Sequence, residues 1–368
     1  MSDFSDADRD YMSHALGLAA LGINTTDPNP RVGCVLVNGE RIVGEGWHER
    51  AGEAHAEARA LQAAGATAAG ATAYVTLEPC AARGRVAPCA EALLTARVAR
   101  VVYATSDPNP AKGGGGARLA AAGVQVQSGL LEAEARALNP GFFKRLERGL
   151  PYVRVKLGVS LDGRSALANG ASRWITGEMA RRDAQHYRAR SSVVLTGVGT
   201  ILGDDPAMNV RLDGATRQPL RVVLDSALRS PPVARLFGRD GPSLVFGVRD
   251  DAARRAALVA AGARVEILPA AADGRVPLEA ALRRLAALEA NEVWVEAGAR
   301  LAGALLTAGL VDELVVYVAP CLLGNEARGL ADLPPLGSLD ERLALRFTEV
   351  RTIGDDLRVT AAVLPKEP

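Results

Sequence analysis

Residues 72–104, TAYVTLEPCAARGRVAPCAEALLTARVARVVYA, contain the elements of one layered unit. The β-branched and aromatic run at 72–77 predicts a strand, 88–97 has the composition of a helix, and 99–104 predicts a second strand. Strands that alternate with helices are typical of α/β domains, in which helices cover a sheet. We therefore expect a layered α/β fold around this stretch.

The segments on both sides continue the alternation. Periodic apolar residues predict an opening helix at 8–21. Asn38-Gly39 favours the type I′ turn of a hairpin between strands 32–37 and 41–46. The other expected elements of the first half are helices at 55–64 and 132–146, a helix after a flexible Gly113–Gly116, and a short strand at 124–127.

Arg148-Gly149-Leu150-Pro151 separates a finished helix from a new apolar strand at 152–159. We therefore expect two domains, residues 1–148 and 149–368. The second is again α/β, and its last two strands, 345–350 and 357–363, are expected to join a mainly parallel sheet in antiparallel orientation. Its other expected strands are 192–198, 220–225, 243–248, 265–268, 292–296 and 314–319, with helices at 178–190, 251–261, 278–290 and 299–308.

The composition narrows the class of protein. The chain has 368 residues, a net charge of +1 and only 4% aromatic residues, which argues against a binder of nucleic acid. An acidic N-terminus without an apolar run predicts no export signal, and no stretch is apolar enough to span a membrane, so we expect a soluble cytoplasmic protein. Cys34 and Cys321 lie in apolar runs and are expected to be core residues.

Three positions in the first half predict a metal site. His55 opens a helix, Cys80 follows a strand, and Cys89 starts the next helix. One imidazole and two thiolates leave the fourth position of zinc open, as in catalytic sites. With Glu57 two residues after His55, the pattern is the signature of zinc-dependent nucleobase deaminases, in which the glutamate moves protons and does not bind the metal. The alternative, a helix-start histidine and two buried cysteines, explains each residue singly but not the set.

The second half contains signals for an anionic ligand. At 293–298 a strand breaks at Gly298 and a helix follows, which predicts a diphosphate site at the helix N-terminus, with Arg300 adding charge. The alternative is that Gly298 and Gly303 only permit a turn and close packing. Gly197-Val198-Gly199 is weaker evidence for such a site. Polar residues at the predicted strand ends, in 156–164, 172–176 and 204–206, indicate one cleft.

With these motifs the chain resembles the bifunctional riboflavin biosynthesis proteins, which fuse a pyrimidine deaminase to a reductase. The resemblance covers nearly the whole chain. It implies a three-layer cytidine-deaminase-like domain followed by a dihydrofolate-reductase-like α/β domain that uses NADPH. The deaminase half is carried by DPNP at 27–30 and again at 107–110, VGC at 32–34, GEG at 44–46, GEAHAE at 52–57 and YVTLEPC at 74–80.

For the deaminase, the resemblance implies attack of zinc-bound hydroxide on 2,5-diamino-6-ribosylamino-4(3H)-pyrimidinone 5′-phosphate, with Glu57 passing the proton to the departing ammonia. The residues that would line its pocket are Asn29, His48, Arg85, Asp107 and Asn109. By itself, His48 is equally compatible with a surface position. The family usually has Ser, His and Thr where this chain has Ala81, Ala82 and Val86, and Arg83 is a candidate to compensate.

This departure keeps other readings open: a reductase with an impaired or altered deaminase, or a binding module with a vestigial zinc site. A nucleoside or nucleic-acid deaminase is a further alternative, although strand binding calls for basic and aromatic stripes.

For the reductase, the resemblance implies hydride transfer from NADPH to C1′ of the ribose. The implied cofactor residues are Trp174, Thr200, Asp204, Ser226, Gly298, Ala299, Arg300, Leu301, Ala302, Gly303 and Ala304. The implied substrate residues are Lys156, Ser172, Arg188, Met208, Arg211 and Glu296, with Asp162 nearby. Arg188 and Arg211 suit a phosphate ester, although singly Arg188 fits a solvated helix position and Trp174 a core aromatic. We also expect a homo-oligomer, a dimer or a tetramer.

Overall fold

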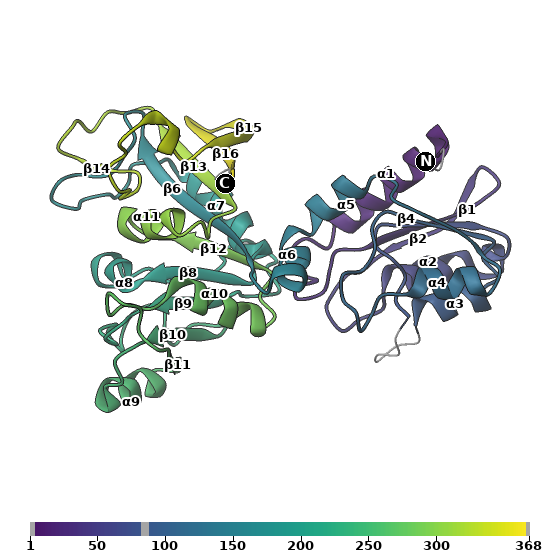
Figure 1. Cartoon of the computed structure of the whole chain (residues 1–368), viewed down its shortest axis with the longest axis horizontal. Coiled ribbons are helices and arrows are strands. Elements are labelled where there is room, and N and C mark those ends of the chain that lie inside the picture. Colours follow the sequence, from purple (N-terminus) through teal and green to yellow (C-terminus); the bar gives the residue numbers. More distant parts are fainter. Residues whose placement is uncertain (1–3, 82–87, 366–368) are drawn as a thin grey trace. The chain divides into compact units, whose positions relative to one another are not determined.

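The computed structural model describes residues 4–81 and 88–365. The chain folds into two units, Met1–Gly149 and Leu150–Pro368 (Figure 1).

The sheet of the first unit begins with an antiparallel hairpin and continues in parallel. Its order is β2-β1-β3-β4-β5, with β1 antiparallel to both neighbours and β3, β4 and β5 parallel. The strands are β1 Gly33–Asn38, β2 Arg41–Trp47, β3 Thr72–Val75, β4 Arg100–Tyr103 and β5 Gln125–Ser128.

Helices cover both faces of this sheet. Alternating side chains of β1 enter two separate cores: Cys34 and Leu36 join one, and Val35 and Val37 the other. α1 Asp6–Ala20 and α5 Glu132–Leu138 pack on the Val35 side. The Cys34 side is covered by α2 Ala56–Ala64, α3 Cys89–Thr95, α4 Gly115–Ala121 and part of α6 Pro140–Arg148. The predicted three-layer α/β fold is therefore confirmed.

The hairpin turn and the last helix of the first unit differ from their predictions. Asn38 pairs with Arg41, and of the turn residues only Gly39 has a positive φ, 61°, so the hairpin follows the type II′ pattern and not type I′. The helix expected at 132–146 is two helices, because Pro140 lacks an N–H group and disfavours helical backbone at Asn139. The break has a use: the Asn139 side chain accepts from Arg31 N at 2.8 Å and donates to Arg31 O at 2.9 Å.

The second unit has a mainly parallel sheet in the order β11-β10-β9-β8-β12-β6-β13-β16-β15. The last two strands are antiparallel, as predicted. The strands of this sheet are β6 Tyr152–Ser160, β8 Val193–Gly197, β9 Leu220–Leu224, β10 Ser243–Gly247, β11 Arg264–Ile267, β12 Glu292–Glu296, β13 Glu313–Ala319, β15 Leu345–Ile353 and β16 Asp356–Val363. A small pair, β7 Arg164–Ala166 with β14 Arg328–Gly329, was not predicted.

Helices cover both faces of this sheet too. One core contains residues of α7 Glu178–Arg190, α8 Val198–Asp204 and α9 Ala252–Ala260. The opposite core contains residues of α10 Leu278–Ala287 and α11 Ala299–Thr307. Helix α8 was not predicted, because its short segment contains Gly199 and Gly203, which have low helix propensity.

The structure also shows how deeply the two remaining cysteines are buried and whether any helix could span a membrane. Cys34 is fully buried as expected, but Cys321 is only half-buried and is followed by Leu322, which is 72% exposed, so the prediction that Cys321 is a core residue is wrong. It lies in the loop after β13, beyond the sheet. Within 4–81 and 88–365, no helix combines the length and hydropathy needed to cross a bilayer.

Candidate active sites

The structure brings His55, Cys80 and Cys89 together, with one ligand atom of each within 4.8 Å of the others. His55 Nδ1 lies 3.2 Å from Cys89 Sγ and 3.7 Å from Cys80 Sγ. The backbone N–H of Cys89 donates to Cys80 Sγ at 3.3 Å. That hydrogen bond favours a thiolate at Cys80, and contacts with Cys89 and His55 lower the pKa of Cys80 despite its burial. One nitrogen and two sulfurs at this spacing suit zinc.

Backbone hydrogen bonds hold both ends of the loop that connects Cys80 to Cys89. Ala90 N donates to Cys80 O at 3.2 Å, and Ala81 N donates to Lys112 O at 2.9 Å. The chain therefore returns to Cys80 at the start of α3. The predicted pocket residue Arg85, together with Ala82, Arg83 and Val86, lies outside the described residues.

Glu57 lies beside this cluster without belonging to it. Residues two apart on a helix point in nearly opposite directions, but His55 is the N-cap residue, with extended backbone at φ −71° and ψ 163°, so its side chain is not tied to the helical spacing. Glu57 is 3% exposed, and burial raises the pKa of its carboxyl group. A buried carboxyl with a raised pKa is suited to proton transfer near neutral pH.

Asn29 and His48 form a second polar group beside the metal ligands. His48 is 3% exposed, so it is not a surface histidine, and its ring centroid lies 5.5 Å from that of His55. Burial lowers the pKa of His48. The neutral ring fits its contacts if Nδ1–H donates to Ala54 O, at 3.1 Å, while Nε2 accepts from Asn29 Nδ2, also at 3.1 Å. His48 thereby orients the Asn29 amide.

The loop with Asp107 and Asn109 is held by Glu78, a residue that the sequence did not single out. The Glu78 carboxylate accepts from Asp107 N at 3.2 Å and from Gly114 N and Gly116 N, both at 3.0 Å. Asp107 in turn accepts from Asn109 N at 2.9 Å, and burial raises the pKa of Asp107 to about 6. The sequence shows only an acid directly before Pro79-Cys80, and this pattern does not indicate that its carboxylate binds backbone N–H groups.

In the glycine run at 113–116, Gly115 and Gly116 are buried at the start of α4, whereas Gly114 is exposed. A Cβ atom on Gly115 would lie 1.7 Å from Pro79 O, so the start of α4 reaches the residue before Cys80 only because Gly115 has no side chain. Gly115 and Gly116, expected in a flexible connection before the helix, therefore belong to the packed start of the helix itself.

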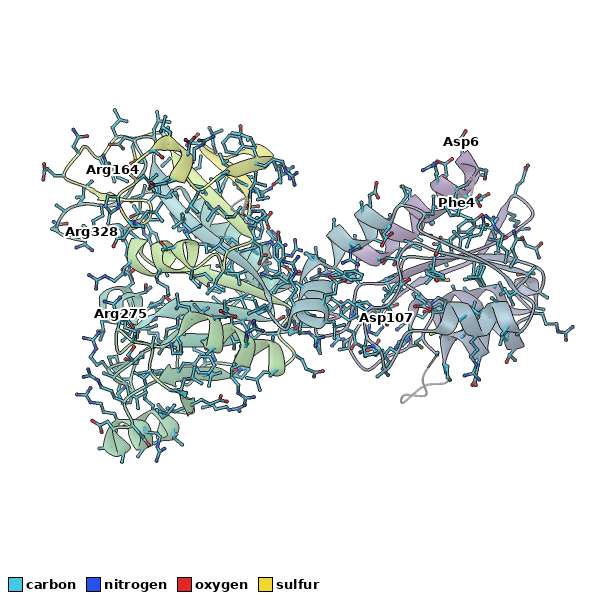
Figure 2. The ribbon with its side chains drawn as sticks, viewed as in Figure 1. Phe4, Asp6, Asp107, Arg164, Arg275 and Arg328 are labelled. Carbon is cyan, nitrogen blue, oxygen red and sulfur yellow. The ribbon has the colours of Figure 1, made fainter. Side chains whose placement is uncertain are left out.

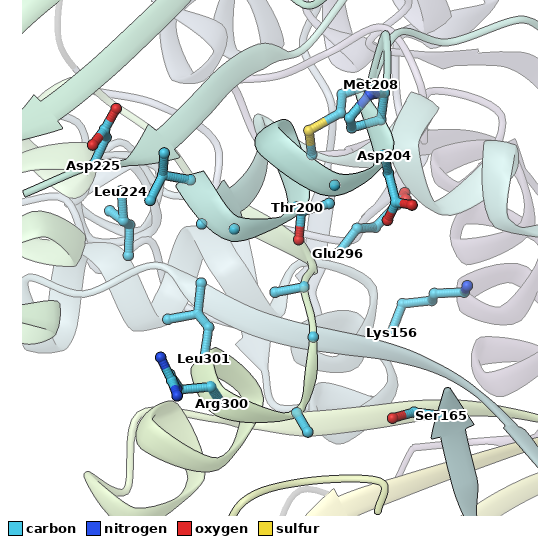
Figure 3. A pocket seen from close by; sticks show the side chains of 18 of the residues that line it. Lys156, Ser165, Thr200, Asp204, Met208, Leu224, Asp225, Glu296, Arg300 and Leu301 are labelled. Carbon is cyan, nitrogen blue, oxygen red and sulfur yellow. The ribbon is translucent and has the colours of Figure 1, made fainter. Parts of the chain in front are cut away.

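In the second unit a cavity of about 2000 Å³ opens at the carboxyl ends of the parallel strands (Figure 3). Such strand ends are where α/β sheets bind ligands. The sequence-predicted residues that line it are Lys156, Ser172, Trp174, Arg188, Thr200, Asp204, Met208, Arg211, Ser226, Glu296, Gly298, Ala299, Arg300, Leu301 and Ala304.

Three predicted residues do not line this cavity. Ala302 is fully buried in the core, and a Cβ on Gly303 would lie 2.0 Å from Asp332 O, so Gly303 permits close packing. Asp162 accepts from the backbone N–H groups of Leu323, at 3.1 Å, and Gly324, at 2.8 Å. Its role is to hold the loop after β13.

Arg188 is buried and forms an ion pair with Glu296. Its Nε and Nη2 donate to the two Glu296 oxygens at 2.5 and 2.7 Å, and its Nη1 donates to Asn209 O at 2.8 Å. Burial alone would raise the pKa of Glu296, but Arg188 lowers it to about 2. Arg188 is therefore not a solvated helix residue, and its guanidinium is already neutralised by a carboxylate.

The remaining cations and Trp174 are more accessible. Trp174 is 69% exposed, with the Arg181 guanidinium 4.4 Å from its ring centroid, so it is not a core aromatic. Among the described residues, the Arg211 side chain makes only a 3.5 Å contact, with Asn209 Oδ1. Lys156 also lines the cavity, and burial lowers the pKa of its amino group.

Comparison with known proteins finds one family model in each unit. Residues 5–105 match the cytidine and deoxycytidylate deaminase zinc-binding region, and residues 151–359 match the RibD C-terminal domain. The chain is 49% identical to riboflavin biosynthesis protein RibD of Escherichia coli, over 95% of this chain and 98% of that one, and 45% identical to RibD of Haemophilus influenzae, over 98% of each.

Solved structures agree over the full length. A structure of Acinetobacter baumannii RibD superimposes with a TM-score of 0.91 at 41% identity, covering 98% of this chain and 99% of that one. The Thermotoga maritima diaminohydroxyphosphoribosylaminopyrimidine deaminase/5-amino-6-(5-phosphoribosylamino)uracil reductase superimposes with a TM-score of 0.86 at 28% identity, covering 97% of this chain and 99% of that one.

Proposed function

The chain belongs to the family of the riboflavin biosynthesis protein RibD, and on this premise we propose which of its residues carry out which reaction. It is a bifunctional enzyme of riboflavin biosynthesis, a zinc-dependent pyrimidine deaminase and an NADPH-dependent reductase. We assign the deaminase to residues 1–148 and the reductase to residues 149–368. The supporting observation is that the His55, Cys80 and Cys89 cluster and the large cavity lie in different units.

In the deaminase, His55, Cys80 and Cys89 would hold zinc, which when bound lowers the pKa of a water molecule and so supplies a nucleophile at neutral pH. Water replaces the amino group on the pyrimidine carbon, so a C–O bond forms, the C–N bond breaks and ammonia leaves. Glu57 takes a proton from the water and delivers it to the departing nitrogen. Its burial beside the cluster is the observation that supports this role.

Substrate would be oriented by Asn29, Asp107 and Asn109, with His48 holding the Asn29 amide. The test is ammonia release from the phosphorylated pyrimidine, measured together with zinc content. A zinc-loaded chain that releases no ammonia would contradict the deaminase assignment.

In the reductase, NADPH supplies the hydride for C1′ of the ribose when bound. The ring oxygen released at C1′ needs a proton, and Lys156 is the proposed donor because it lines the cavity and its lowered pKa makes proton release easier. The test is substrate-dependent loss of NADPH absorbance. A chain that consumes no NADPH with the deaminated substrate would contradict this assignment.

The phosphate ester of the substrate is assigned to Arg211 and not to Arg188. Arg188 is occupied by Glu296, whereas the guanidinium of Arg211 has only a long contact with Asn209. We expect Arg211→Ala to raise KM for the pyrimidine about 10-fold or more, as for loss of a charge-assisted hydrogen bond. An unchanged KM would rule out this role.

We further propose that the chain forms a homodimer through β15. This strand is at the edge of its sheet (Figure 1), where it leaves main-chain groups unpaired, and it exposes Phe347 by 71% and Val350 by 57%. Light scattering of the purified chain tests this, and Phe347→Lys should shift the mass towards the monomer. A monomeric wild type would contradict it.

The cytoplasm is the proposed location, because the thiolates of Cys80 and Cys89 must stay reduced to bind zinc. Fractionation of cells that produce the chain tests this.

A further inference from the structure

The large cavity has two ends of different character. Figure 3 shows Lys156, Glu296 and Asp204 towards one end, Leu224 and Asp225 towards the other, and Thr200 and Leu301 between them. Lys156 and Glu296, at the first end, belong to the residues that the resemblance implies for the pyrimidine substrate. The second end, at Ser226 and the loops after β10 and β11, has no role in the chemistry proposed above.

Ser226 connects the loops of this second end. Its carbonyl accepts from Val248 N at 3.2 Å and Arg249 N at 3.0 Å, and its Oγ accepts from Val276 N at 3.2 Å. Arg249 and Arg275, which is labelled in Figure 2, therefore flank Ser226 from two different loops, and all three residues line the cavity.

The two arginines are available for an anion. Arg249 has no side-chain partner among residues 4–81 and 88–365, and Arg275 makes only an exposed 3.6 Å contact with Asp273. The acidic groups next to Arg249 are engaged elsewhere: Asp250 pairs with Arg255 at 3.0 Å, and Asp251 caps α9.

Asp225, another acid at this end, is fully buried and contacts Ser230 through one oxygen, while its Oδ1 has no hydrogen-bond partner among the described residues. Its Oδ2 accepts from Ser230 N at 2.7 Å and from Ser230 Oγ at 2.8 Å. Asp273 also lines the cavity and is exposed beside Arg275, so the exposed charges of Arg249, Arg275 and Asp273 sum to +1.

The distance along the sheet fits one extended dinucleotide. Strand β10, which precedes Arg249, is four strands from β6, which carries Lys156, so at about 4.8 Å per strand the two ends lie ~19 Å apart. A dinucleotide with its diphosphate at the start of α11 and its nicotinamide beside Lys156 would place its adenosine at β9 and β10.

We infer that Arg249, assisted by Arg275, binds the phosphate on the 2′-oxygen of the adenosine ribose and so selects NADPH over NADH. The inference rests on the proposed reductase function of this cavity. An arginine beside the adenosine ribose is a general means of accepting a 2′-phosphate, where an NAD site presents a carboxylate to the ribose hydroxyl.

The first test is direct binding, without turnover. The affinities for adenosine 2′,5′-bisphosphate and for 5′-AMP are measured by calorimetry on the wild type and on Arg249→Ala. Arg264→Ala, which removes one positive charge away from the cavity, is the matched control. Only Arg249→Ala should weaken the bisphosphate, by about 10- to 100-fold as for a charge-assisted hydrogen bond, while 5′-AMP binding stays unchanged. Unchanged bisphosphate binding in both Arg249→Ala and Arg249→Ala/Arg275→Ala would overturn the inference.

The second test uses NADH as an internal control. In Arg249→Ala, kcat/KM for NADPH should fall by a similar factor while kcat/KM for NADH is retained. Equal losses with both cofactors, or a rise in KM for the pyrimidine in place of the NADPH effect, would overturn the inference. A wild type that oxidises no NADPH would contradict the reductase function itself, and the bisphosphate measurement would still decide the role of Arg249.

Discussion

The metal cluster of the first unit brings its ligand atoms within 4.8 Å of one another, whereas the cavity of the second unit has a volume of about 2000 Å³ and takes side chains from residues 156 to 332. The first site is fixed by close packing: Gly115 lies against Pro79, and Glu78 binds three backbone N–H groups. The second site is an open cavity, and the buried Arg188–Glu296 ion pair lies in its wall. We therefore expect substitutions in the first site to change both its activity and the stability of the fold. In the second site, substitutions of ligand-binding side chains should change binding with little effect on stability.

The largest effect is expected from Glu57→Gln, which keeps the shape of the side chain but cannot transfer a proton. Deamination should fall by about 10²- to 10⁴-fold, while zinc content and NADPH oxidation with the deaminated substrate are retained. Ammonia release and metal analysis check this. Glu53→Gln, at an exposed glutamate that pairs with Arg59, is the matched control and should retain ammonia release. Ammonia release at the wild-type rate in Glu57→Gln would rule out its role in proton transfer.

In the second unit the largest loss of stability should follow Arg188→Ala. The substitution leaves the Glu296 carboxylate buried without its partner, which typically costs about 3–5 kcal/mol. Differential scanning calorimetry should show the transition of this unit lowered and that of the first unit unchanged. Arg182→Ala, at an exposed position of the same helix, should change stability by less than about 0.5 kcal/mol. Equal effects of the two variants would show that the pair does not support the cavity.

The same pair predicts how the second unit responds to acid. The pKa of Glu296 is about 2 in the folded chain and lies below its ordinary value of 4.5, so the unfolded chain binds the proton more readily. The stabilisation is complete above about pH 4.5 and is lost as the pH falls towards 2. Acid unfolding followed by near-ultraviolet circular dichroism checks this. In Glu296→Gln this part of the pH dependence should be absent, and an unchanged profile would contradict the assignment.

The two sites also differ in what the sequence could predict. His55, Glu57 and Cys80 belong to residue types and spacings that indicate zinc chemistry before any fold is known. Arg188 and Glu296 are 108 positions apart in the sequence. Arg188 is in α7, just before β8, and Glu296 ends β12, so the two meet because β8 and β12 are neighbours in the sheet. Local propensity therefore could not distinguish a buried Arg188 from a solvated one.

Backbone interactions were equally hidden from the sequence. Glu78 accepts hydrogen bonds from main-chain N–H groups, and no pattern of side chains in the sequence predicts such contacts. Helix α8 was missed because its glycines have low helix propensity. Most strands were predicted within a few residues, because apolar runs between turn residues are a strong signal.

A smaller effect is expected from Gly115→Ala, which tests the close packing of the first site. The added Cβ would lie 1.7 Å from Pro79 O, so α4 or the Pro79-Cys80 segment must shift, at a typical cost of about 1–3 kcal/mol. Because Cys80 follows directly, zinc affinity should fall together with the melting temperature. Chelator competition measures the affinity. A variant with a lowered melting temperature but wild-type zinc affinity would show that packing and metal binding are not coupled here.

The smallest effect, and of opposite sign, is expected from Gly199→Ala in α8. An ideal Cβ at Gly199 meets no atom within 4 Å, and the backbone there has no positive φ, so alanine fits without strain. Alanine also reduces the conformational freedom of the unfolded chain, and the second unit should gain about 0.4–1 kcal/mol. Calorimetry of the chain without ligands checks this. Destabilisation at Gly199 as large as at Gly115 would show that the wall of the open cavity is packed as closely as the metal site, and the contrast between the two sites would fail.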